Sequence, residues 1–177
     1  MSSEDEARIV SWAQCGDREA MERLLRGVQS RLHAYVMRLV GADAAADVLQ
    51  EVLIAIARKL PWLTDPHLFR PWAFRIASRA AFRHLRRERR WRQAADETDF
   101  DALPAPEPPP PADRLRELLD SPELSPASRA VLVLHFQEEM PLADVAAVLE
   151  IPIGTAKSRL AYGLKALRRH LGEKRSP

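Results

Sequence analysis

Arginine and aromatic side chains gather in one stretch of this chain in a pattern suited to binding nucleic acid. Between Arg79 and Arg92 there are seven arginines and a single acid, Glu88. Guanidinium groups pair with phosphate oxygens, and aromatic rings stack on unpaired bases. The candidate residues here and in the loop before are Phe69, Arg75, Arg79, Phe82, Arg83, Arg86 and Arg87. Composition alone leaves open a solvated basic helix end, favoured by the helix dipole.

A second basic stretch lies near the C-terminus, where a predicted helix has one apolar and one polar face. The inner stripe is predicted to be Ile153, Ala156, Leu160, Leu164, Leu167 and Leu171. The outward candidates are Thr155, Lys157, Ser158, Arg159, Tyr162 and Lys165. Such side chains at the start of a recognition helix contact bases or phosphates in the major groove. Periodicity also permits a three-helix bundle that merely has a charged face.

The sequence carries little that points to enzymatic chemistry. The five histidines are scattered, and none forms the paired His/Asp spacing of a metal site; they are His33, His67, His84, His135 and His170. Cys15 is the single cysteine, which excludes an internal disulfide and a multi-cysteine zinc site. We therefore expect no catalytic residue, metal or cofactor. Cys15 is interpreted as a small, partly buried residue, with a redox-active thiol as the alternative.

Charge is distributed unevenly along the 177 residues. The formal net charge is only +2, which by itself argues weakly for a nucleic-acid partner. However, residues 1–92 have a net charge of +6, residues 93–125 of −7 and residues 126–177 of +3. The small total therefore hides two basic regions on either side of an acidic one, and this asymmetry indicates charged partners.

The acidic segment also contains the densest run of prolines, from Pro104 to Pro111. Proline fixes φ and lacks an N–H, so this run predicts an extended, semi-rigid segment. We interpret residues 94–113 as an interdomain linker, with a proline-rich ligand for a signalling domain as the alternative. No apolar stretch approaches 18 residues and no secretory signal is visible, so we expect no membrane insertion and a cytoplasmic location.

The elements that position these residues are predicted to be helices alone. Helical spacing of apolar residues predicts helices over residues 17–40, 44–60 and 72–91, with a loop at 64–71. The third of these is predicted to bury Trp72, Ile76, Ala77 and Ala80. Further helices are predicted over 126–137, 142–149 and 152–171, with Ser125 as an N-cap and the order of a helix-turn-helix. The prediction is an all-α chain with helical domains at 1–93 and 114–177.

Several strings of residues resemble the extracytoplasmic-function (ECF) sigma factors, in the order in which that family has them. Residues 45–52, AADVLQEV, look like region 2.2, and residues 69–77 with 84–87 look like regions 2.3 and 2.4. Residues 124–134, 144–146 and 151–160 closely resemble region 4, where the string GTAKSRL is specific. The resemblance covers about residues 17–92 and 115–171.

This resemblance implies roles for the matching positions. Asp47, Gln50 and Glu51 match the family's docking site on the β′ coiled coil of RNA polymerase; without the resemblance they are an ordinary solvated face. The loop 64–70 matches the place where the family captures a flipped −10 base. The positions that match the place where it holds the −10 strand are Arg79, Phe82, Arg83, Arg86 and Arg87. Those that match the reader of the −35 duplex are Thr155, Lys157, Ser158 and Arg159.

The implied partners are core RNA polymerase (β′ coiled coil and β flap), promoter DNA and an anti-sigma factor. Ala46, Leu53, His84 and Ala156 depart from the family's usual acid, Phe, Asp and Val, so no promoter sequence can be carried over. A helix-turn-helix regulator that does not bind polymerase is the alternative. It would explain residues 126–171 but not the matches at 47–53 and 69–87. A helical nuclease is a further alternative.

Overall fold

The computed structural model describes residues 3–93, 119 and 124–173, and all elements within these ranges are helical. The all-α prediction is therefore confirmed. The chain separates into two compact units, Met1–Arg90 and Trp91–Pro177, which are described one at a time. The predicted linker at 94–113 lies outside the described residues. Within the described ranges no helix is both long enough and apolar enough to cross a membrane.

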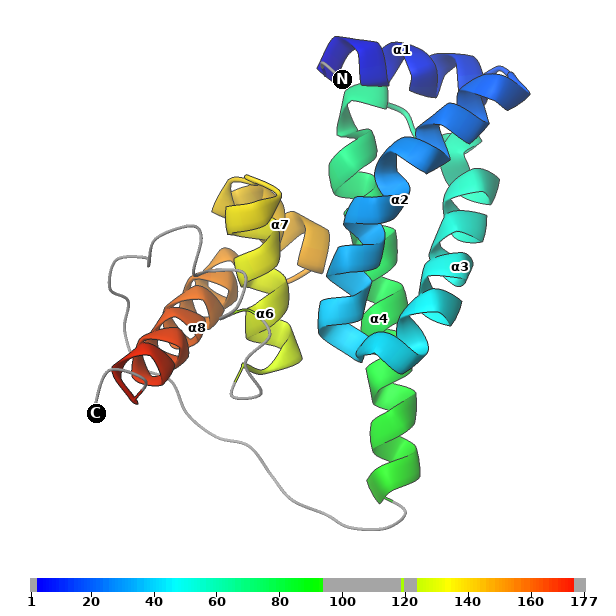
Figure 1. Cartoon of the computed structure of the whole chain (residues 1–177). Helices are drawn as coiled ribbons and strands as arrows, with labels where there is room; N and C mark the ends of the chain where they lie inside the picture. Colours follow the sequence, from blue (N-terminus) through cyan, green and yellow to red (C-terminus); the bar gives the residue numbers. More distant parts are fainter. Residues whose placement is uncertain (1–2, 94–118, 120–123, 174–177) are drawn as a thin grey trace. The chain divides into compact units, whose positions relative to one another are not determined.

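Three long helices form the body of the first unit: α2 (Arg18–Val40), α3 (Ala42–Lys59) and α4 (Phe69–Gln93) (Figure 1). The Asp17 side chain caps α2 by accepting a hydrogen bond from Ala20 N at 3.0 Å. Gly41, predicted to end that helix, does so with φ of +86°, a conformation that glycine adopts without steric cost. The first two helix predictions are thus confirmed to within two residues.

The core of this unit is built on aromatic and branched side chains that meet between α2, α3 and α4. Tyr35 and Phe74 are fully buried, and their rings meet edge-on with centroids 5.3 Å apart. Val52 and Ile56 of α3 have no exposed surface. On α4 the buried residues include Phe74 besides the predicted Ala77 and Ala80, whereas the predicted core residues Trp72 and Ile76 are only half-buried.

A helix that the sequence analysis did not predict precedes these three. Helix α1 (Ser3–Gln14) buries Ala7, Ile9, Val10 and Ala13. It packs on α2 and on two short 3-10 turns that follow α3, and it lies across the end of the three long helices (Figure 1). The acidic residues of its first turn are favourable at a helix N-terminus.

The segment between α3 and α4 runs from residue 60 to residue 68 and is more regular than the loop predicted at 64–71. It consists of two 3-10 turns, η1 (Leu60–Trp62) and η2 (Pro66–Leu68), and α4 begins directly afterwards at Phe69. The predicted start at residue 72 was therefore wrong by three residues. Pro71 does not interrupt α4 because the N–H groups of the first helical turn have no partner within the helix.

The second unit has the helix order predicted from the sequence. It contains α6 (Pro126–Leu132), which continues as a π-helical turn η3 (Val133–Gln137), then α7 (Leu142–Leu149) and α8 (Ile153–Glu173). Ser125 caps α6 as predicted, since its Oγ accepts from Ser128 N at 3.1 Å. Glu150 ends α7 in the left-handed conformation, with φ of +56°. This one-residue reversal sends the chain directly into α8.

Helices α6 and α8 cross closely at a glycine. A Cβ atom placed on Gly163 would lie 2.7 Å from Leu132 Cδ1, a distance shorter than any real contact. Ala156, Leu164 and Leu167 form the buried stripe of α8 as predicted. Leu160 is only half-buried, and Ile153, the first residue of the helix, is 44% exposed.

Candidate polymerase and nucleic-acid interfaces

Helix α3 presents a short polar face opposite its buried side. Asp47, Gln50 and Glu51 are all exposed, and their spacing of three and four residues places them on one side of the helix. Val48 and Leu49, which lie between them in sequence, and Val52, which follows Glu51, are buried in the unit. The structure therefore brings the three predicted polymerase contacts together as one accessible cluster.

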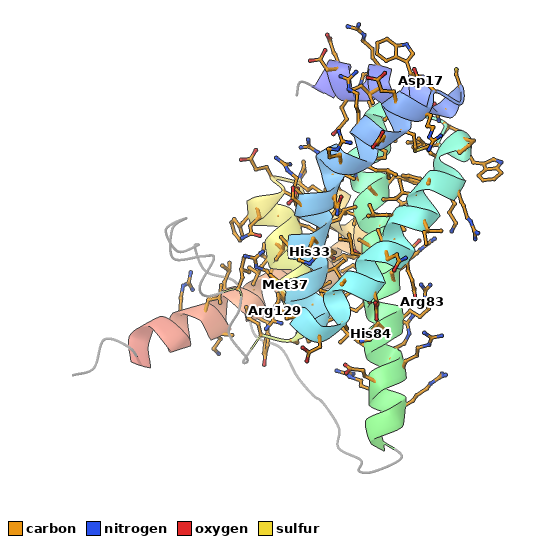
Figure 2. The ribbon with its side chains drawn as sticks, turned by 45° about the vertical axis from the view of Figure 1, so that its right-hand side comes forward. Asp17, His33, Met37, Arg83, His84 and Arg129 are labelled. Carbon is orange, nitrogen blue, oxygen red and sulfur yellow. The ribbon has the colours of Figure 1, made fainter. Side chains whose placement is uncertain are left out.

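One member of this cluster is joined to the arginine-rich helix. The Arg83 guanidinium lies 2.8 Å from Glu51 Oε2, and the two side chains are 53% and 54% exposed. Figure 2 labels Arg83 on α4. An ion pair this exposed contributes about 0–1 kcal/mol to stability. The ion pair matters because it joins Glu51, which is predicted to contact polymerase, to Arg83, which is predicted to contact DNA.

The arginines of α4 form a basic surface on the first unit. Arg79, Arg83, Arg86 and Arg87 are exposed, as a phosphate-binding role requires. Arg75 differs from them because it is half-buried and its Nε is enclosed without a hydrogen-bond partner among the described residues. These arginines lie at steps of three and four residues, so they share one side of the helix.

Not all of the aromatic residues predicted to contact bases are exposed enough to stack on one. Phe69 is fully buried, with its ring centroid 6.1 Å from that of Trp72. It cannot stack on a base in this conformation, and we correct its role to that of a core residue. Phe82 and Trp72 are half-buried. Helical spacing alone did not reveal this, because the face occupied by Phe69 depends on where α4 begins.

The exposed aromatic residue of this region is one that the sequence analysis did not select. Trp62, in η1, is 76% exposed, and Leu68, in η2, is 53% exposed. Both lie beside or within the predicted base-capturing loop 64–70. One weak signal was present, because a tryptophan directly after Pro61 and outside any helical pattern has no obvious place in a core.

The predicted −35 residues lie on the first three turns of α8. Lys157 and Tyr162 are exposed, and Thr155, Ser158 and Arg159 are half-buried. Ser158 Oγ donates to Gly154 O at 2.9 Å, which leaves its lone pairs open to accept hydrogen bonds. The helix thus offers cationic groups and hydroxyl groups at its N-terminal end, the part that enters the groove in helix-turn-helix proteins.

Two further predictions concern single residue types. Cys15 is exposed, contrary to the expectation of partial burial, because it follows the last residue of α1. Among the described residues no group of three or more His, Cys, Asp or Glu side chains is placed to hold a metal ion.

Comparison with known proteins connects both surfaces to one family. The family model described as "Sigma-70 region 2" matches residues 21–91, and "Sigma-70, region 4" matches residues 122–169. The ECF RNA polymerase sigma factor SigL of Mycobacterium tuberculosis is 32% identical over 93% of this chain and 96% of its own length. The chain belongs to the ECF sigma factors. A helix-turn-helix regulator of another family would not account for the region 2 match.

Other relatives agree with this membership. CarQ, an RNA polymerase sigma factor of Myxococcus xanthus, is 32% identical over 89% of this chain and 92% of its own length. The ECF RNA polymerase sigma factor SigE of Mycolicibacterium smegmatis is 32% identical over 96% of this chain, which spans only 65% of that longer protein.

Solved structures of sigma factors share the fold. The sigma factor RpoE of Bartonella quintana, crystallised with the anti-sigma factor NepR, superposes with a TM-score of 0.67 at 23% identity, over 87% of this chain and 98% of that one. CnrH, solved with the cytosolic domain of CnrY, gives 0.66 at 23% identity, over 97% and 99%.

Proposed function

We propose that this ECF sigma factor directs core RNA polymerase to specific promoters and so initiates DNA-templated transcription. The observation that supports this most strongly is the occurrence of both sigma-70 regions, in family order, on two separate compact units. The polymerase supplies the chemistry, so we assign no catalytic activity and no cofactor to the chain itself.

In this proposal the first unit has two contacts. The exposed α3 cluster of Asp47, Gln50 and Glu51 binds the β′ coiled coil, which requires accessible acids and amides. The basic side of α4 holds the −10 strand, with phosphates paired to guanidinium groups. The residues assigned to the −10 strand are Arg75, Arg79, Phe82, Arg83, Arg86 and Arg87.

The second unit holds the −35 duplex and contacts the β flap. Its DNA residues are Thr155, Lys157, Ser158, Arg159 and Tyr162, near the N-terminal end of α8. Phosphate contacts fix the register of such a helix, and contacts to base edges give it specificity. We propose that residues 94–113 tether the two modules, so that binding of one raises the effective concentration of the other.

We further propose a cytoplasmic site of action and control by an anti-sigma factor. The polymerase for which its relatives are named works in the cytoplasm. Two solved sigma factors of the same fold were crystallised or solved with partner proteins, and one of these is named as an anti-sigma factor. Such a partner would act by covering the α3, α4 or α8 surfaces.

Reconstitution tests the proposed function directly. The chain is added to core polymerase and supplied with a library of genomic fragments, and transcripts are mapped by sequencing their 5′ ends. We expect initiation at a defined set of start sites that core polymerase alone does not use. Failure to select any start site would overturn the proposal.

The assignment of α8 is tested with Arg159→Ala. We expect this change to weaken binding of a −35 duplex by about tenfold or more, the range for loss of one arginine contact to a base pair, and to leave core polymerase binding unchanged. Lys165→Ala removes the same charge further along α8 and serves as the control, with a smaller effect expected. Equal losses of duplex and polymerase binding by Arg159→Ala would contradict the assignment.

A further inference from the structure

Trp62 is exposed without a reason in the fold. At 76% it is the most exposed large hydrophobic side chain among the described residues. An indole is a large apolar group that proteins usually bury or place at an interface. The exposure is also local, since Leu60 in the same turn and Leu63 directly after it are both buried.

The backbone that carries Trp62 is held on both sides by one side chain of α1. The amide nitrogen of Gln14 donates to Leu60 O at 2.9 Å and to Leu63 O at 2.6 Å. Its two hydrogens are thus divided between the carbonyls before and after Trp62. Leu63 N also donates to Leu60 O at 3.0 Å, and Pro61 fixes its own φ. The ring is therefore presented by a turn ordered in advance.

The charge around this turn suits a nucleic-acid strand. Arg58 and Lys59 precede it, and both are exposed. Asp65 is the single acid between residues 52 and 69. Its carboxylate is occupied locally, because it accepts a hydrogen bond from His67 N at 2.9 Å. An exposed aromatic ring beside cations is the arrangement that binds single strands by stacking.

We propose that Trp62 is a stacking platform for an unpaired base of promoter DNA, and that Gln14 is the positioning residue that holds it. The inference rests on the proposed function and extends it to a residue outside the predicted set. It also gives the region an accessible ring in the place where Phe69 was expected to supply one.

Photocrosslinking in the complete initiation complex tests this. The probe is a promoter that the wild-type holoenzyme selects in the reconstitution experiment. A set of such promoters is made, each with 5-iodo-deoxyuridine at a different single position of the non-template strand in the melted segment. We expect one position to crosslink to the peptide that contains Trp62. Trp62→Leu should abolish that crosslink and shorten the lifetime of the open complex about tenfold, which is within the range for loss of one stacked base. Trp62→Phe should restore most of that lifetime.

Trp12→Leu is the matched control, since Trp12 is also exposed, at 46%, but lies on α1. It should leave both measurements at wild-type values. If promoters are selected normally but Trp62→Leu keeps the wild-type lifetime, the inference is overturned and the proposed function stands. If Trp62→Leu lowers only the affinity for core polymerase, Trp62 is a protein contact and the inference is likewise overturned. If the wild-type chain selects no promoter, the inference and the proposed function are both overturned.

Gln14→Met tests the positioning role because it keeps the length of the side chain and removes both N–H donors. We expect a weaker Trp62 crosslink, together with unchanged binding of a −35 duplex and of core polymerase. A crosslink yield equal to that of the wild type would remove Gln14 from the proposal, and a general loss of all three signals would show a merely structural role.

Discussion

At the scale of single residues, a buried polar pair holds α2 against α4. The hydroxyl groups of Tyr35 and Ser78 lie 2.7 Å apart, and Ser78 Oγ donates to Phe74 O at 2.8 Å. Ser78 must therefore accept the hydrogen of Tyr35, which satisfies both hydroxyl groups away from water. Because α4 carries the proposed −10 arginines, this pair helps to fix their orientation relative to α3.

Tyr35→Phe should lower the free energy of unfolding by about 1 kcal/mol, the usual loss for one buried hydrogen bond. Denaturant titration measures the change, and a double-mutant cycle with Ser78→Ala should give a coupling energy of similar size. Additive effects of the two substitutions would show that the hydroxyl groups do not interact.

The same tyrosine predicts a pH dependence. Burial raises the pKa of Tyr35 well above its ordinary value of 10, with the hydrogen bond to Ser78 opposing in part. The unfolded chain then releases the proton at lower pH than the folded one, so this contribution to stability is complete below about pH 10 and is lost above it. The difference in unfolding free energy between wild type and Tyr35→Phe should accordingly shrink as pH rises above 10.

The positions of the charged residues could be predicted from the sequence, whereas those of the aromatic residues, which depend on burial, could not. Arg79, Arg83, Arg86 and Arg87 of α4 are exposed as expected, since a guanidinium group is costly to bury, and Arg75 alone of the predicted arginines in that helix is half-buried. Phe69, predicted to contact bases, is buried, and the exposed Trp62 was not among the predicted residues. A ring gains free energy in a core and at an interface alike, so its type does not say which one it occupies.

At the scale of elements, helix boundaries account for the differences between prediction and structure. The apolar periodicity of α2, α3 and α7 was sufficient because each has a clear stop at Gly41, Pro61 or Glu150. Helix α1 has only 12 residues, with three acids in its first turn, and its buried residues Ala7, Ile9, Val10 and Ala13 were not recognised as a helical stripe. The start of α4 could not be predicted because Pro66 precedes it and Pro71 lies in its first turn, and proline is common both in loops and in first helical turns.

The crossing of α6 and α8 gives a prediction at this scale. Gly163→Ala should lower the free energy of unfolding by about 1 kcal/mol, since the new methyl group must displace the fully buried Leu132 and overpacking outweighs the gain in helix propensity. Gly154→Ala, in the same helix with no atom within 4 Å, should instead raise it by about 0.5–1 kcal/mol. Thermal unfolding of both variants makes the comparison, and equal shifts would contradict the packing argument.

At the scale of the whole molecule, a nearly neutral chain contains two basic modules. The net charges of +6 and +3 on residues 1–92 and 126–177 are offset by −7 on the segment between them. Exposed basic groups attract DNA and exposed acidic groups repel it, but both effects reach only about one Debye length, about 8 Å at physiological salt. Local pairing therefore matters more than total charge, and the Arg83–Glu51 pair is where the proposed polymerase and DNA surfaces meet.

That pair predicts opposite effects of a single substitution on two partners. Glu51→Gln removes a proposed polymerase contact, so the affinity for core polymerase should fall. It also releases Arg83 from its carboxylate partner, so binding of the chain to a short labelled duplex should strengthen, with a salt slope steeper by up to about one phosphate contact.

Asp47→Asn is the control, because it removes an equal charge from the same face without touching the Arg83–Glu51 pair. It should weaken polymerase binding and leave the salt slope of duplex binding at its wild-type value. Because both variants carry the same change in net charge, a long-range field would move their DNA binding equally. A difference between them therefore isolates the Arg83–Glu51 ion pair as the link between the proposed polymerase surface and the proposed DNA surface.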